Sequence, residues 1–170
     1  KGFSATAAGM IVMCQPITMA IFSPIAGRLS DKFEPKYLST VGMGITCCGL
    51  IMLSNLEIDS ALNYLIFSLI IIGFGFSLFS PPNVNAIMGS VEKRFYGSAT
   101  GAMATMRIVG QMFSMVLVTL IFALVIGSVD INQENYGALE DAIRIIFSIS
   151  AILCIPGLYL SMARGNFIRT

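Results

Sequence analysis

Histidine and tryptophan are both absent from this chain of 170 residues. Without histidine, the protein lacks the commonest metal ligand and the side chain best suited to proton transfer near neutral pH. Charged residues are also scarce, at 11% of the sequence, whereas 56% is hydrophobic and the mean hydropathy is +0.84. A soluble domain of this size needs far more charge to cover its surface, so the composition predicts a polytopic membrane protein.

Several functional classes lack the residues that they require. A net charge of +1, with no basic cluster beyond short loops, offers nucleic acid nothing to bind. The sequence has no Cys/His cluster and no acidic residue within its long apolar runs, so we expect no enzymatic activity, no cofactor and no metal site. The cysteines all lie in apolar runs without C-x-x-C spacing, and we interpret them as small buried hydrophobic residues: Cys14, Cys47, Cys48 and Cys154.

Charged residues divide the chain into five apolar segments, each long enough to cross a bilayer as a helix of about 20 residues. Helix is the expected form, because backbone polar groups in lipid must be satisfied within their own segment. We therefore predict an all-α fold, a polytopic membrane helix bundle of five transmembrane helices. The predicted spans are residues 4–26, 38–56, 62–86, 99–127 and 143–163.

Lysine and arginine are unevenly distributed between the two sides of these spans. Lys1 and Arg144 flank spans on one side, and the other side carries Arg28, Lys32, Lys36, Lys93, Arg94, Arg164 and Arg169. Since basic loops stay on the cytoplasmic side, we predict a multi-pass cell-membrane protein with a cytoplasmic C-terminus. Five spans that start outside, with no initial methionine, indicate the C-terminal piece of a longer chain.

The segment between the first two spans resembles a known family signature. Gly27-x-Leu29-x-Asp31-Lys32-x-x-x-Lys36 is similar to the G-x-L-x-D-[RK]-x-G-[RP]-[RK] loop of the major facilitator superfamily. Later elements resemble the drug:proton antiporter branch with fourteen spans. They are Gly73-Phe74-Gly75-Phe76, Pro81-Pro82, Gly97-Ser98-Ala99-Thr100-Gly101 and Arg107-Ile108-Val109-Gly110, together with the opening Ser4-Ala5-x-x-Ala8-Gly9.

This resemblance implies that the five helices are the last five of a C-terminal six-helix half. The partners would then be the lipid bilayer, the N-terminal half of the same transporter, a small-molecule substrate and protons. Function by this resemblance is proton-coupled export of small amphipathic compounds by alternating access. Because no predicted span contains an acidic residue, the proton-carrying carboxylate would lie in the N-terminal half.

The charged loop has two interpretations. By resemblance it is a cytoplasmic gating loop, made of Gly27, Arg28, Asp31, Lys32 and Lys36, that holds one state of the transport cycle. Alternatively, its charges are solvated and only set the topology. Glu34 stands where the family usually has glycine, which weakens the gating interpretation.

Polar residues within the spans are candidates for the substrate pathway. Arg107 is the only charge well inside an apolar run, and Gln111 and Ser114 follow it on one helical face. The alternative for Arg107 is snorkelling to the interface. Asn83 and Asn85 follow two prolines that free backbone carbonyls. Gln15, beside Pro16, either faces a cavity or bonds a neighbouring helix.

Glycines at small-x-x-x-small spacing predict close helix packing. The pairs are Gly97 with Gly101 and Gly73 with Ser77, and Gly42, Gly44, Gly49 and Gly110 suit the same purpose. Two other functions remain open from the residues. One is a facilitator for another cargo, such as a sugar, metabolite or siderophore, and the other is a membrane scaffold subunit without transport.

Overall fold

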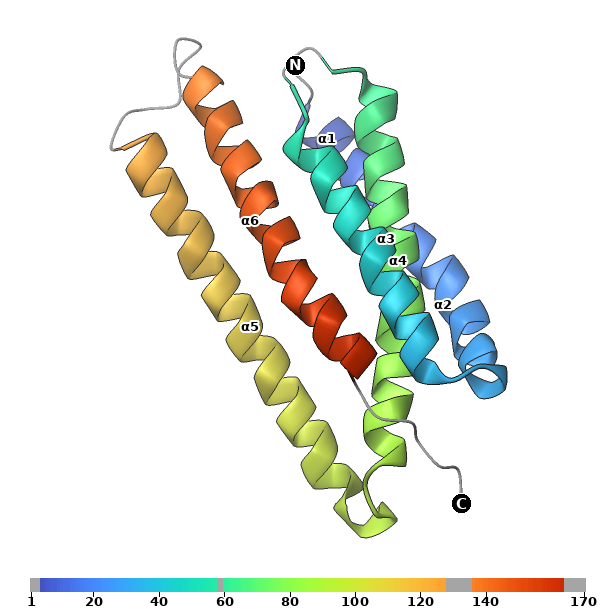
Figure 1. The fold of residues 1–170 in the computed structure, drawn as a ribbon. Coiled ribbons are helices and arrows are strands. Elements are labelled where there is room, and N and C mark those ends of the chain that lie inside the picture. Colours follow the sequence, from blue (N-terminus) through green and yellow to red (C-terminus); the bar gives the residue numbers. More distant parts are fainter. Residues whose placement is uncertain (1–3, 58–59, 128–135, 164–170) are drawn as a thin grey trace.

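A computed structural model describes residues 4–57, 60–127 and 136–163, and within these ranges the chain is helical and contains no strand. The helices are α1 (Ala5–Val12), α2 (Cys14–Lys32), α3 (Pro35–Ser54), α4 (Leu62–Gly89), the short 3₁₀ helix η1 (Lys93–Phe95), α5 (Tyr96–Val125) and α6 (Tyr136–Ala163) (Figure 1). The predicted all-α class is confirmed.

Five helical segments are long and apolar enough to cross a membrane, as predicted. They are Thr6–Ser30, Pro35–Ser54, Leu62–Gly89, Lys93–Val125 and Gly137–Met162. The helices run beyond the apolar limits that hydropathy marks, most clearly at the start of α6, where Gly137–Ala142 is helical. Polar residues at a helix end shorten the hydropathy signal without stopping the helix.

The first segment is interrupted near its start. α1 ends at Val12 and α2 begins at Cys14, with Met13 between them in a right-handed conformation. Pro16 explains the interruption, because it has no N–H to donate to the carbonyl of Val12 four residues earlier. The chain nevertheless continues in one direction, since the N–H of Ile17 bonds the carbonyl of Met13 at 3.1 Å.

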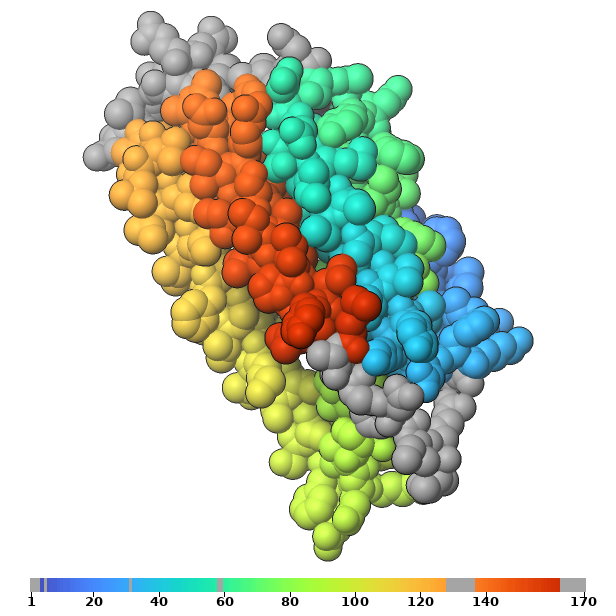
Figure 2. Space-filling model, in the orientation of Figure 1, coloured from blue at the N-terminus to red at the C-terminus, as the bar shows by residue number. Residues whose placement is uncertain are grey.

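α4 is the centre of the bundle. It packs against α2 and α3, and α6 packs on the side of α3. α5 contacts mainly α6, which lies between α5 and α3 (Figures 1 and 2). Small residues dominate the buried positions of the two central helices, and these are Ser39, Gly42, Gly49 and Ser54 on α3 and Ser68, Gly73, Gly75, Ser77 and Ala86 on α4.

Three glycines let α4 meet its neighbours backbone to backbone. A Cβ atom on Gly42 of α3 would lie 2.7 Å from the carbonyl oxygen of Gly75, and one on Gly75 would lie 2.8 Å from that of Gly42. On the other side of α4, a Cβ atom on Gly73 would lie 2.5 Å from the carbonyl oxygen of Gln15 on α2. Since side chains cannot fit at these distances, the glycines set the spacing of α2, α3 and α4.

The glycines of α5 behave differently from those of α3 and α4. Nothing lies within 4 Å of a Cβ built on Gly97, Gly101 or Gly110. The packing prediction therefore holds for Gly42, Gly49 and Gly73, whereas Gly97, Gly101 and Gly110 pack against no neighbour within the described residues.

We predict that Gly42→Ala destabilises the protein by about 1–3 kcal/mol, because the new methyl group overpacks a backbone contact. Gly101→Ala is the matched control, because its methyl group enters open space and alanine favours helix over glycine by about 0.5–1 kcal/mol. The measurement is the thermal unfolding midpoint of the purified protein in detergent. Equal midpoints for Gly42→Ala and Gly101→Ala would contradict the backbone contact.

Candidate functional site: the basic end and the polar face of α5

The predicted gating loop is mostly helical. Gly27, Arg28, Asp31 and Lys32 belong to the last turns of α2, and Lys36 lies in the first turn of α3. Only Phe33 and Glu34 connect the two helices, both in extended or nearly extended conformations. Pro35 explains the short turn: it disfavours helix at the preceding residue and suits the first position of the next helix. The predicted spans left residues 27–37 between the first two helices, and this is corrected to a two-residue turn.

Basic side chains surround this turn. Arg28 and Lys32 are exposed, and Gly27 and Lys36 are half-buried. The side chain of Asp31 lies outside the described residues, so its predicted role stays a prediction. No described carboxylate forms an ion pair with the three cations. Lys32, in the last turn of α2, stabilises the negative end of that helix dipole.

Asn85 approaches the turn from α4. Its amide Nδ2 donates to Ser30 Oγ at 2.9 Å, and Ser30 is only 2% exposed. On α3, Thr40 Oγ1 lies 2.9 Å from Ser161 Oγ on α6. We singled out none of Ser30, Thr40 and Ser161 from the sequence, because serine and threonine are common in membrane helices and only the fold pairs them.

The double proline does not break α4. Helix continues through Pro81 and Pro82 to Gly89, and Pro82 is completely buried. Asn83 and Asn85 do not converge on one site, because residues two apart on a helix point to different faces. Asn83 is half-buried, whereas the Asn85 residue is exposed overall and uses its amide on Ser30.

Gln15 lies far from this cluster. It is half-buried on α2 where that helix meets Gly73 of α4. Gly73 and Asn85 are twelve residues apart on one helix, which corresponds to about 18 Å along its axis. The five predicted pathway residues therefore do not form one pocket within this chain.

Arg107 and Gln111 stand on α5, and both are exposed. Helical spacing places these two and Ser114 on one side of the helix, roughly the side of Ile121, which is 8% exposed. We call Arg107, Gln111 and Ser114 the polar face of α5.

The side of α5 away from the polar face is apolar. It carries a shallow hollow of about 650 Å³, which is lined by Met112, Met115, Val116, Thr119, Leu120 and Ala123. Unbranched methionine side chains adapt to varied apolar contacts. α5 thus presents one polar and one methionine-rich face, with few contacts to the described helices.

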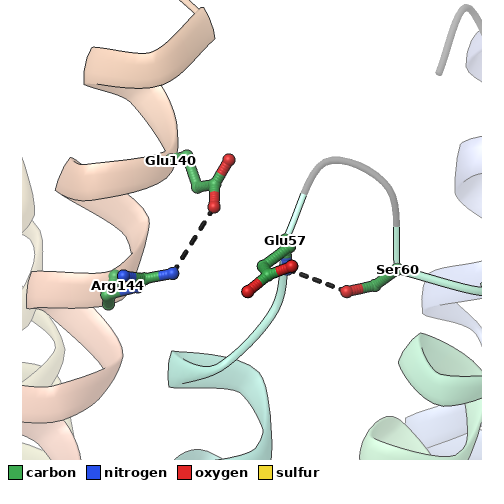
Figure 3. Close-up of polar contacts among 4 residues, drawn as sticks. All are labelled: Glu57, Ser60, Glu140 and Arg144. Carbon is green, nitrogen blue, oxygen red and sulfur yellow. Dashed lines mark hydrogen bonds and ion pairs between the residues drawn. The ribbon is translucent and has the colours of Figure 1, made fainter.

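The opposite end of the bundle carries acidic residues. The N–H of Glu57 donates to Ser60 Oγ at 2.8 Å and closes the turn between α3 and α4, and Glu140 pairs with Arg144 on α6 at 3.5 Å (Figure 3). The pair is partly exposed, and such pairs contribute little to stability. The described part of the chain contains no group of three or more residues suited to hold a metal ion.

Comparison with known proteins decides the family. The family model described as the Major Facilitator Superfamily matches residues 1–165. The chain belongs to this superfamily. It is 30% identical over 165 residues to the riboflavin transporter RibZ of Clostridioides difficile, covering 95% of this chain and 36% of that protein.

Other superfamily relatives are comparably similar. The uncharacterized transporter YebQ of Escherichia coli is 28% identical, across 97% of this chain and 34% of its own length. Multidrug resistance protein 3 of Bacillus subtilis is 31% identical, across 79% of this chain and 25% of its own. The chain thus spans about a third of the first two relatives. No solved structure matches significantly.

We predict that α5 is the least protected helix of the isolated 170-residue chain, because it has few helix neighbours. Hydrogen–deuterium exchange in detergent should show faster amide exchange in residues 99–116 than in α3 and α4. The same segment should become slow to exchange in the full-length transporter. Equal protection of α5 and α4 in the isolated chain would contradict the loose packing.

Proposed function

We propose that this chain is the C-terminal part of a proton-coupled secondary transporter that exports small amphipathic compounds by alternating access. The match to the superfamily along residues 1–165 carries the transport role. The coverage of about a third of the relatives supports a partner half elsewhere in the same protein. In this proposal α5 faces that half, and the basic turn lies on the cytoplasmic side.

The polar face of α5 supports a pathway role for Arg107 and Gln111. Arg at the centre of a membrane helix costs about 2.5–3.5 kcal/mol on insertion scales, so it is retained where it meets water or polar partners. Both side chains are exposed, and in this proposal they border an aqueous cavity between the two halves. The methionine-rich hollow on the other side suits packing against an adaptable apolar surface.

Export of amphipathic compounds is favoured by the similarity to a protein named for multidrug resistance. The charges available here fit only part of that cycle, since the acidic residues of the described spans, Glu140 and Asp141, stand in the first turns of α6 and none lies deeper in a span. The proton-carrying group therefore belongs to the partner half in this proposal. Arg107 then contributes a fixed positive charge, which repels cations in one state and attracts a carboxylate in the other.

A second candidate is import or export of a metabolite. The relative with 30% identity over 95% of the chain is named as a riboflavin transporter, which favours a planar, polar aromatic cargo. Riboflavin added as a competitor in the assay below separates the two candidates.

We predict that inverted vesicles carrying the full-length protein accumulate ethidium when a proton gradient is imposed, and that an uncoupler abolishes this accumulation. Arg107→Ala should lower the initial rate about tenfold, equivalent to about 1.4 kcal/mol. Arg94→Ala is the matched control, because Arg94 is exposed and its contacts are with the adjacent Glu92 and Phe95. Asp31→Asn tests the predicted gating role of Asp31 in the same assay. Its matched control is Glu34→Gln, which removes a nearby carboxylate in the turn.

Ethidium transport that is insensitive to the uncoupler would contradict proton coupling. No ethidium transport, with gradient-driven riboflavin movement instead, would replace the drug-export proposal by the second candidate. Equal losses in Arg107→Ala and Arg94→Ala would remove the pathway role of Arg107.

A further inference from the structure

The two-residue turn at Phe33 and Glu34 lies between two hydrogen bonds, each of which joins a different pair of helices. One turn before it, Ser30 on α2 is bonded to Asn85 on α4 at 2.9 Å. After it, Thr40 on α3 is bonded to Ser161 on α6 at 2.9 Å. The turn is thus attached on both sides to helices that are distant in sequence.

In the hydrogen bond on α2, Ser30 Oγ acts as both donor and acceptor. Ser30 Oγ donates its hydrogen to the carbonyl of Gly27 at 2.8 Å, so its lone pairs are available to the amide of Asn85. Because Ser30 is 2% exposed, loss of this partner leaves a buried hydroxyl with one contact fewer. Asn85 stands about one helical turn after the fully buried Pro82, on the same side of α4.

The bond on α3 has the same form. Thr40 Oγ1 bonds the carbonyl of Lys36 at 2.8 Å, one helical turn earlier, and this uses its single hydrogen. Ser161 therefore donates to Thr40 across the α3–α6 contact. In both cases a hydroxyl tied to its own helix accepts a bond from a neighbouring helix.

The connection between these two hydrogen-bonded helix ends is short and conformationally constrained. Phe33 is extended and its N–H still bonds the carbonyl of Leu29 at 2.9 Å, and Pro35 fixes the start of α3 directly after Glu34. The backbone at Arg28, Lys32 and Lys36 is thereby attached to α4 and α6.

We propose that Ser30, Asn85, Thr40 and Ser161 are positioning residues, which fix the basic turn to α4 and α6 during transport. This inference rests on the proposed transport function. A displacement of α4 or α6 moves the turn with it as long as both bonds are intact. When either bond is lost, the turn and its cations follow the movement less closely.

The test places nitroxide spin labels on the full-length transporter at Glu34→Cys, in the turn, and at Tyr159→Cys, exposed on α6, with the native cysteines replaced by alanine. Double electron–electron resonance then measures the distribution of distances between them. Thr40→Val removes one hydroxyl at nearly constant volume and should broaden this distribution, and Ser30→Ala should do the same. Thr40→Ser keeps the hydroxyl, so its distance distribution should be as narrow as that of the parent protein.

Thr100→Val is the matched control. The Thr100 hydroxyl bonds only the carbonyl of Tyr96 on its own helix, at 2.8 Å, so the same substitution there should leave the distribution unchanged. The proposal is overturned if Thr40→Val and Ser30→Ala stay as narrow as the parent protein, or if Thr100→Val broadens the distribution equally. If Ser30→Ala does not fold, Thr40→Val and Thr40→Ser, compared with Thr100→Val, decide the test.

Transport kinetics supply the second readout. Thr40→Val should lower Vmax about threefold and leave KM unchanged. Threefold is the ratio that corresponds to the average free energy of a hydrogen bond between membrane helices. A broadened distribution with unchanged Vmax overturns the role in transport. Because the spin-label distances need no transported substrate, a parent protein that moves neither ethidium nor riboflavin refutes the proposed function without affecting the positioning result.

Discussion

Direct contact between helix backbones at α4 is the constraint on which the rest of this bundle depends. Gly75 meets Gly42 of α3 on one side, and Gly73 meets the Gln15 carbonyl of α2 on the other. In lipid, burying apolar side chains gives helices no reason to associate, so close van der Waals packing and hydrogen bonds must hold them. Ser68 and Ser77, buried on α4, bond to carbonyls of their own helix and so fill the interface with little volume.

This close packing divides the chain into two parts with different properties. α2, α3 and α4 form a dense unit, and α6 joins it through α3. α5 has no glycine contact with a neighbour, and its side chains between Met106 and Val116 are exposed. In the function proposed above, this exposed helix meets the rest of the transporter, its polar face borders the pathway, and the dense unit supports it.

Much of the architecture was predictable, because the charged residues mark the ends of the apolar segments and backbone satisfaction in lipid requires helix. The roles of individual residues were not. Gly97 and Gly101 have the same spacing as packing glycines, yet only the three-dimensional arrangement shows open space beside them. The short turn at Phe33 was readable from Pro35, but the family signature suggested a longer loop. Ser30 with Asn85 and Thr40 with Ser161 are separated by more than fifty residues, and no local pattern pairs them.

The most direct measurement is the water accessibility of α5 in the full-length transporter in membranes. Single cysteines at Gln111, on the polar face, and at Val116, in the apolar hollow, are treated with a charged, membrane-impermeant thiol reagent from each side in turn. If α5 lines an alternating-access pathway, Gln111→Cys reacts, bound ethidium or riboflavin slows the reaction, and Val116→Cys does not react. Reaction at Val116→Cys alone, or at neither position, would contradict the placement of the polar face in the pathway.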